Sequence, residues 1–480
     1  MMRGIKVRAI SIALILGAYA IGCSTDEIVT PKNPQTGGDA VTGGDSTTGG
    51  SVATGGQTNT GGALSTGGDE DAGDYMAPVP SLPTPVAYIA GGNFAALGTY
   101  TGISGHAQII RAADGTTTVQ LHVEGLTAST EYPAHVHALP CEVDSGGGHY
   151  MIDPSVDMSD ESNEIWPGFT TDADGVGRAN INVAHAARPD AQAIVIHDPA
   201  ASNAKMACAN LEPEPLATTT ASGTFAPFAG ATADEMGIGG TATLVRSASG
   251  TEVSLAITGL SAGGTYVAHV HAMPCAIMDG GGHYKIDPTI MDTDETNELW
   301  PAFGSDAGAA GISSTHVARL DAQSVVVHRS DLATPAPKVA CADLVREEAY
   351  GDYMTEGTAI ELADAASKGV SGLSATGKMT RSVAPSTKAD IEVSGLLAST
   401  DYGIHVHDHS CALNSGGGHY LIDTNIASGD QNNEMWLNLT TDATGAGTQT
   451  VTVDHIARPE AAAIVIHDPD STRVACIDLN

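Results

Sequence analysis

Short runs in which apolar and polar residues alternate are the dominant pattern of the chain after Ala87. In TVQLHVEGL (118–126) the residues Val119, Leu121 and Val123 fall on one face, and the pattern returns in EVSLAITGL (252–260) and ADIEVSGL (389–396). A period of two predicts antiparallel strands with one buried face. AIVIH (193–197) is apolar on both faces, as in a deeply buried strand, and no stretch shows sustained helical periodicity. The pattern predicts an all-β protein built of sandwiches or barrels.

The strand patterns belong to a threefold internal repeat. AHVHALPCEVDSGGGHY (134–150) returns as AHVHAMPCAIMDGGGHY (268–284) and as IHVHDHSCALNSGGGHY (404–420), at offsets of 134 and then 136 residues. A unit of about 125 residues is long enough to bury its own core. We therefore expect three tandem domains, over 86–215, 216–348 and 349–480.

Two segments precede the repeats. Residues 1–23 have a basic start and a short apolar run ending AIGC, which is too short for a membrane span and resembles a bacterial lipoprotein signal with lipidation at Cys23. Ordinary secretion with Cys23 discarded is the alternative. Residues 24–85 repeat the triplet TGG every six residues and contain almost no aliphatic residues, which predicts a disordered Gly/Thr-rich tether.

Charge and cysteine content restrict the partners and the compartment. The formal net charge is −36, with 20 basic against 56 acidic residues, so nucleic acid is not expected as a partner. After Cys23, the cysteines come as one pair per repeat, separated by 67, 66 and 65 residues. This even set predicts one disulfide per domain and an oxidising compartment, whereas six free thiols would leave the regular pairing unexplained. The paired residues are Cys141 and Cys208, Cys275 and Cys341, and Cys411 and Cys476.

Histidines at fixed offsets are the candidate chemistry. Residues two apart on a strand point to one face, so His135 and His137 can address one ion. The glycine run at 146–148 can return the chain to deliver His149, and His197 ends the buried AIVIH strand. Four imidazoles suit Cu(II) or Zn(II) better than calcium or magnesium. The other repeats supply His269, His271, His283 and His328, and His405, His407, His419 and His467.

The ordered motifs GLTASTEYPAHVH, Cys141, GGGHY, TDADGVGRANI, AIVIHD and KMAC resemble the copper/zinc superoxide dismutases, and the likeness recurs in each repeat. The resemblance implies Greek-key β-sandwich or barrel domains, copper held by the four histidines of each repeat, and the Cys141–Cys208 disulfide. It also places the family's guiding cation at Lys205, Lys338 and Arg473. Residues 150–169, 284–303 and 420–439 contain no histidine. The zinc site is therefore expected to be missing, as in the copper-only branch of the family.

Without zinc, the outer nitrogen of His149 needs another partner. The repeated motif NE(I/L/M)W offers Glu164, Glu298 and Glu434, each fifteen residues after the GGGHY histidine. A carboxylate in this place would orient the imidazole; the alternative is a solvated loop glutamate beside a core tryptophan. His185, His316 and His455 also recur, either as an auxiliary site or, more in keeping with their positions, in packing and loop hydrogen bonding.

The predicted function is a copper-dependent superoxide dismutase, with one copper per domain, superoxide anion as its substrate and contact with the membrane only through a lipid anchor at Cys23. It is expected in the bacterial envelope, as an outer-membrane lipoprotein on the periplasmic or surface face. If activity differs among domains, the third should be fastest because it has arginine at the cation position. The alternatives are a copper-binding protein that buffers the metal without turnover, and a structural or adhesive array.

Overall fold

A computed structural model describes residues 87–156, 160–213, 218–290, 292–301, 309–346 and 351–479. These residues belong to one compact unit, Gly73–Asn480, and the predicted all-β fold is confirmed. The helical segments of the described ranges are three single 3-10 turns: η1 (Asp144–Gly146), η2 (Met278–Gly280) and η3 (Ala366–Lys368). The predicted signal segment, with Cys23, and the predicted tether lie outside the described residues. None of the described helices is both long and apolar enough to cross a bilayer.

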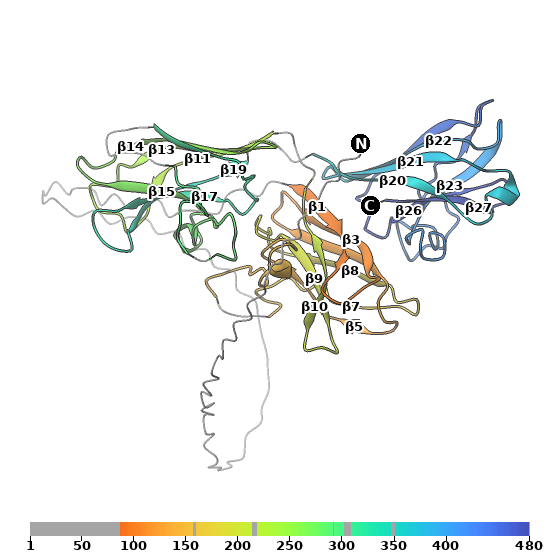
Figure 1. The fold of residues 1–480 in the computed structure, drawn as a ribbon, viewed down its shortest axis with the longest axis horizontal. Coiled ribbons are helices and arrows are strands. Elements are labelled where there is room, and N and C mark those ends of the chain that lie inside the picture. Colours follow the sequence, from red (N-terminus) through yellow and green to blue (C-terminus); the bar gives the residue numbers. More distant parts are fainter. Residues whose placement is uncertain are drawn as a thin grey trace, which may run out of the picture. The chain divides into compact units, whose positions relative to one another are not determined.

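The first repeat forms two four-stranded antiparallel sheets, ordered β1-β3-β4-β8 and β2-β10-β9-β6 (Figure 1). A short pair, β5-β7, lies beside them. The strands are β1 (Tyr88–Asn93), β2 (Ala95–Ala96), β3 (Ser104–Arg111), β4 (Thr117–Glu124), β5 (Glu131–Tyr132), β6 (Ala134–His137), β7 (Phe169–Thr170), β8 (Gly177–Val183), β9 (Ala193–Asp198) and β10 (Ala204–Asn210).

The second repeat keeps this strand order but adds β19 at the edge of one sheet, so its sheets are ordered β16-β14-β13-β11-β19 and β12-β18-β17-β15. Its strands are β11 (Thr218–Thr224), β12 (Ala226–Pro227), β13 (Gly239–Ser247), β14 (Gly250–Thr258), β15 (Tyr266–His271), β16 (Ala309–Ser314), β17 (Ser324–Arg329), β18 (Lys338–Asp343) and β19 (Val345–Arg346).

In the third repeat one long strand joins the two layers into a single eight-stranded sheet, ordered β24-β23-β26-β27-β20-β21-β22-β25. The joining strand β20 pairs with β21 along its first part and with β27 at its end, a role that β1 and β2 divide in the first repeat. The strands are β20 (Tyr353–Glu361), β21 (Ser374–Ser382), β22 (Ser386–Ser394), β23 (Asp401–His407), β24 (Leu439–Thr440), β25 (Gly447–Val453), β26 (Ala463–His467) and β27 (Arg473–Asp478).

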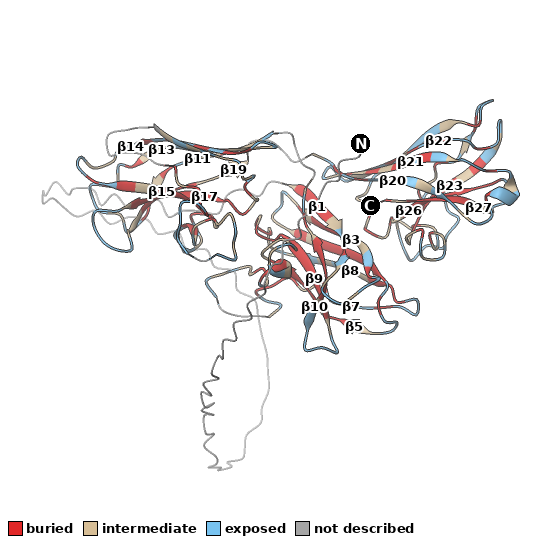
Figure 2. Ribbon diagram, viewed as in Figure 1, coloured by how far each residue is buried: buried red, intermediate tan, exposed pale blue. Residues whose placement is uncertain are grey.

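Each repeat has its own apolar core between its layers. In the first repeat Val119 and Leu121 of β4 face Ile194 and Ile196 of β9, and Figure 2 shows the buried positions in red. The strands β14 and β22 alternate between buried and exposed positions as predicted. Strand β4 differs, because its outer face is buried as well. Contacts with the third repeat, described below, cover that face.

The predicted disulfides form within each repeat: Cys141–Cys208, Cys275–Cys341 and Cys411–Cys476. Each joins the loop after the HVH histidines to the last long strand of its repeat. In the first repeat the bond therefore fixes that loop to the sheet that carries His197, and the other repeats have the same arrangement.

Candidate metal centre

Three histidines of the predicted quartet, His135, His137 and His197, come from adjacent strands of one sheet. Strand β6 carries His135 and His137 and pairs antiparallel with β9, where Val195 lies opposite His135. His197 follows two residues after Val195, so its side chain leaves the sheet on the same face. The same pairing joins β15 to β17 and β23 to β26 in the other repeats.

The glycine run delivers the fourth histidine. Gly146 has a φ of 96°, and a Cβ on it would lie 2.8 Å from Cγ2 of Val195, so a larger residue does not fit without movement. The turn closes with a hydrogen bond from the Ala138 N–H to the Gly148 carbonyl (2.9 Å), and His149 then forms a β-bridge with His137. The glycines are therefore needed to place His149 beside the strand histidines.

The four imidazoles of each repeat converge. In all three quartets, one ring nitrogen from each histidine lies within 4.8 Å of the others. Nε2 of His137 lies 3.3 Å from Nε2 of His197, and the corresponding pairs in the other repeats lie at 3.2 Å. The structure thus brings together all twelve histidines that the sequence predicted, in three groups.

Hydrogen bonds on the outer side of the rings leave one nitrogen of each available to an ion. Nδ1 of His137 donates to the Gly147 carbonyl (3.0 Å), and Nδ1 of His197 donates to the Asn203 carbonyl (2.8 Å), so Nε2 of both points inward. Nδ1 of His135 is buried and finds no hydrogen-bond partner among the described residues. A buried nitrogen without a partner is costly. The donor set therefore fits a copper or zinc ion, which would occupy these nitrogens.

Burial keeps most of these rings neutral, as a metal ligand must be. It lowers the pKa of His135 to about 4 and that of His137 to about 3, with a further lowering by the neighbouring His149. In the third repeat the pKa of His405 falls to about 4 and that of His407 to about 2 for the same reasons. Ligand nitrogens would then stay free of protons well below neutral pH.

These lowered pKa values predict acid sensitivity of the metal-free protein. Between pH 6.5 and about 4 the unfolded chain binds more protons at His135 than the folded chain, so folding stability falls as the pH falls through this window. A single histidine whose pKa falls from 6.5 in the unfolded chain to about 4 in the folded chain lowers the free energy of unfolding by roughly 3 kcal/mol at pH 4. Thermal unfolding in chelator at pH 7, 6, 5 and 4 measures this, and His135→Gln should reduce the pH dependence. A flat melting temperature across the series would contradict the prediction.

The NE(I/L/M)W glutamates lie where the sequence predicted. Nδ1 of His149 donates to Oε2 of Glu164 at 2.7 Å, and Nε1 of Trp166 donates to the same oxygen at 2.6 Å. Glu164 is fully buried, which excludes the solvated-loop alternative. The equivalent His–Glu bonds, His283–Glu298 and His419–Glu434, are 2.7 and 2.6 Å. Each glutamate therefore fixes the orientation of the GGGHY histidine.

The second oxygen of these glutamates has a different partner in each repeat. Oε1 of Glu164 has no hydrogen-bond partner among the described residues. Oε1 of Glu434 accepts from the Gly429 N–H, whereas Oε1 of Glu298 accepts from Nζ of Lys285. Lys285 directly follows the GGGHY motif of the second repeat, where the other repeats have Met151 and Leu421. Within the described ranges, the second centre is the one whose orienting carboxylate carries an ammonium group.

Replacing the orienting glutamate should weaken metal binding. We expect Glu164→Ala to reduce the copper affinity of the first centre roughly 10- to 100-fold, because His149 then loses its hydrogen-bond acceptor. Chelator competition with the full chain measures this change, and the first centre should become the one with the lowest copper affinity. Glu161→Ala, at an exposed glutamate of the same loop, is the control and should leave all three affinities unchanged. Equal affinities in the two variants would refute an orienting role.

The three predicted cations border the centres. Lys205 on β10 lies opposite His197 on the neighbouring strand β9, next to a shift in the strand register before Ala207. Lys338 and Arg473 have the same position in their repeats. Nζ of Lys205 donates to the Asp144 and Gly147 carbonyls (2.8 and 2.6 Å). The Gly147 carbonyl also accepts from His137, so each cation stabilises the glycine turn that holds the ligands.

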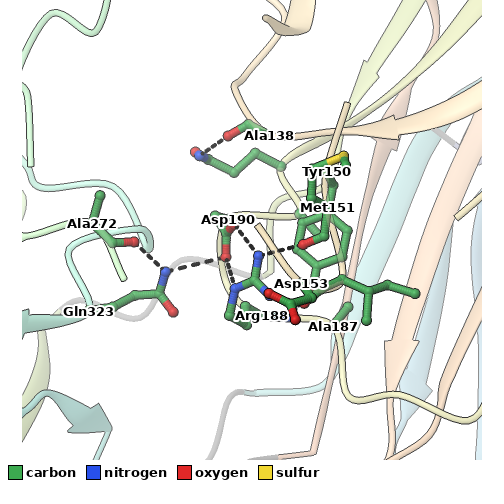
Figure 3. Close-up of polar contacts among 12 residues, drawn as sticks. Ala138, Tyr150, Met151, Asp153, Ala187, Arg188, Asp190, Ala272 and Gln323 are labelled. Carbon is green, nitrogen blue, oxygen red and sulfur yellow. Dashed lines mark hydrogen bonds and ion pairs between the residues drawn. The ribbon is translucent and has the colours of Figure 1, made fainter. Parts of the chain in front are cut away.

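The structure adds one arginine per repeat that the sequence analysis did not single out. Arg188 donates to the Met151 and Ile152 carbonyls and to Asp190, and its guanidinium lies 4.7 Å from the centre of the Tyr150 ring (Figure 3). Arg319 and Arg458 repeat these carbonyl contacts. The shared motif AR(P/L)(D/E)A was the available signal. These arginines hold the segment that follows each GGGHY histidine.

His185, His316 and His455 do not join a metal group. Nε2 of His185 lies 2.8 Å from the Tyr150 hydroxyl, and the corresponding distances are 2.7 and 3.3 Å. They serve in loop hydrogen bonding, as their positions favoured.

No protein-family model matches the chain, and a search of curated proteins also finds no match.

Proposed function

We propose that the protein is a copper-dependent superoxide dismutase with one centre in each repeat. The observation that carries the proposal is the threefold quartet of converging histidines, each with a buried glutamate on the outer nitrogen of its GGGHY histidine. Because the carboxylate orients the outer nitrogen of this histidine, no second metal ion is needed there, which favours the copper-only form. The resemblance of the ordered motifs to copper/zinc superoxide dismutases supports the same assignment.

The residues of the first centre have different roles. Bound copper would supply one-electron chemistry, accepting an electron from one superoxide and returning it to another. His149 is the most accessible ligand of the first centre, with 29% of its side chain exposed. When Nε2 of His149 is not bound to the ion it can take up a proton from solvent, and we assign to it the delivery of that proton to the peroxide product, which takes its second proton from water. Glu164 keeps the ring oriented through Nδ1. His135, His137 and His197, all buried, hold the ion.

Anion guidance should differ among the repeats, because the cations differ in spare hydrogen-bond donors. All three N–H groups of Lys338 can be used by the Met278, Asp279 and Gly281 carbonyls, whereas Arg473 has five donors and three carbonyl contacts. Burial also lowers the pKa of Lys338. We expect the third centre to be fastest and the second slowest.

The ranking is tested in full chains that keep one intact quartet. Arg473→Ala should lower superoxide consumption by the third centre several-fold, and more than Lys338→Ala lowers that of the second. Raised ionic strength should reduce the difference. An Arg473→Ala effect no larger than that of Lys338→Ala would contradict the ranking.

We further propose that the chain acts in the bacterial envelope, exported and anchored by lipid at Cys23. The three disulfides support an oxidising compartment. Growing cells with labelled palmitate checks the anchor, and Cys23→Ser should abolish incorporation of the label.

The decisive experiment loads the full chain with copper, counts the bound metal and measures superoxide decay with and without cyanide. About one copper per repeat with rapid, cyanide-sensitive decay is expected. Full copper occupancy without decay would leave a copper-buffering protein as the function, and a chain that binds no copper would exclude both.

A further inference from the structure

One sheet face of the first repeat is covered where the equivalent faces of the other repeats are exposed. On β3 and β4 the outward residues form a contiguous patch, because His106 pairs with His122 and Gln108 with Gln120 across the strands. All are at most 7% exposed. At the matching positions Thr241 and Ala256 of the second repeat and Thr376 and Glu392 of the third are exposed. The residues of this face are His106, Gln108, Gln120, His122 and Glu124.

The covering segment comes from the metal-binding loop of the third repeat. Ser410 donates to both carboxylate oxygens of Glu124, from its N–H at 2.9 Å and from its hydroxyl at 2.5 Å. The His409 ring packs edge-on against His122, at 5.9 Å between ring centres, and its Nε2 lies 3.3 Å from Nη2 of Arg178. Burial raises the pKa of Glu124, but the hydrogen bonds from His122 and Ser410 outweigh it and lower the pKa to about 2. Glu124 is therefore ionised in the contact.

A second group of contacts extends the same surface. The Tyr353 hydroxyl lies 3.0 Å from Nε2 of His106, with the two rings stacked at 5.6 Å between centres. Gln108 donates to the Ala457 carbonyl at 3.2 Å. Tyr353 begins β20 and Ala457 precedes β26, so both belong to the third repeat.

The sequence departs from the repeat pattern on both sides of this contact. Between the HVH histidines and the cysteine the first two repeats have Ala-Leu-Pro and Ala-Met-Pro, but the third has Asp408, His409 and Ser410. A proline in place of Ser410 could donate neither hydrogen bond. Glu124 likewise stands where the other repeats have Thr258 and Ser394. The residues that break the repeat are therefore those that meet in the fold.

We propose that the outer face of β3 and β4 is a docking surface for the 408–418 loop of the third repeat, and that docking holds the ligands of the third metal centre in place. Asp408 follows the ligand His407, and its Oδ1 accepts from the N–H of Gly418, which precedes the ligand His419 (2.6 Å). The same oxygen lies 2.5 Å from Nδ1 of His409. The docked residues thus connect the two ends of a loop with a ligand at each end. Among the residues that the structure describes, only the third centre has this support, and the docking does not depend on which metal is bound.

Hydrogen exchange of the full, metal-free chain tests the proposal. Glu124→Thr, which introduces the residue of the second repeat, and Ser410→Ala should each speed amide exchange in both 118–124 and 408–418, roughly tenfold, because a charge-assisted hydrogen bond is lost. Exchange in the matching loops 138–148 and 272–282 should not change. Ser394→Thr and Thr258→Ser, at exposed positions of the same register, are the matched controls and should leave all these segments unchanged.

Two exchange results would contradict the docking proposal. Faster exchange of 118–124 together with unchanged exchange of 408–418 in Glu124→Thr would overturn the proposal, as would an unaffected loop in Ser410→Ala. Circular dichroism confirms that each variant is folded. Copper affinity of the third centre, measured by chelator competition with the full chain, should also fall several-fold in Ser410→Ala and not in the Thr258→Ser control.

Discussion

A chain in which His137, His271 and His407 are all replaced by alanine should bind no copper tightly and should consume superoxide no faster than buffer does. Each of these histidines is buried, with Nε2 3.2 to 3.3 Å from that of the histidine on the neighbouring strand. Removing it takes away a ligand and leaves a cavity that the remaining three imidazoles cannot close. Elemental analysis after gel filtration and a superoxide decay assay measure the two effects.

The single variants sharpen this expectation. Each alone should lower the copper content by one ion per chain and leave the other two repeats folded and loaded. His185→Gln, at a recurring histidine outside the quartets, should retain full copper content. A triple variant that still carries about three tightly held copper ions would show that the quartets are not the metal centres.

Loss of the third disulfide should markedly lower the stability of its repeat. Cys411→Ala with Cys476→Ala opens a loop with a sequence separation of 65 residues, and the free energy of unfolding of that repeat should fall by about 4 kcal/mol in the chain-entropy estimate. Cys411 lies four residues after the ligand His407, so copper affinity of the third centre should fall as well.

Guanidinium denaturation, followed by the fluorescence of Trp436 in a chain whose other tryptophans are phenylalanine, measures the change. Cys23→Ala is the control, because Cys23 has no place in the pairs, and it should leave the denaturation midpoint unchanged. A midpoint for the double variant equal to that of the control would contradict a stabilising role for this disulfide.

Much of the fold and the site follows from local pattern and repetition. Alternation along 252–260 and 389–396 predicts the half-buried strands β14 and β22, and two-residue spacing predicts that His135 and His137 share a face. Cysteine spacing predicts the three disulfides. The fifteen-residue offset from His149 to Glu164 predicts their hydrogen bond, because it recurs unchanged in every repeat. Repetition made these features visible by separating fixed positions from variable ones.

What the sequence did not predict depends on contacts between distant segments. Alternation along 118–126 predicts one solvated face, but Ser410 and His409 cover that face from a segment almost 300 residues away. His106, His122 and His409 each occur in a single repeat, so no second copy indicated a role. Each of them also contacts another repeat, and strand periodicity carries no information about such a contact.

The ion pair between Lys285 and Glu298 has a consequence for the three copies as a set. A carboxylate whose negative charge is balanced by an ammonium group attracts the N–H proton of the imidazole less strongly. That imidazole is then a poorer electron donor to a bound cation. Copper in the second repeat would have a greater electron affinity than copper in the first, where Glu164 has no such counter-charge. The repeats would then have centres with different redox thresholds, and the single polypeptide would respond over a wider range of conditions than three identical centres.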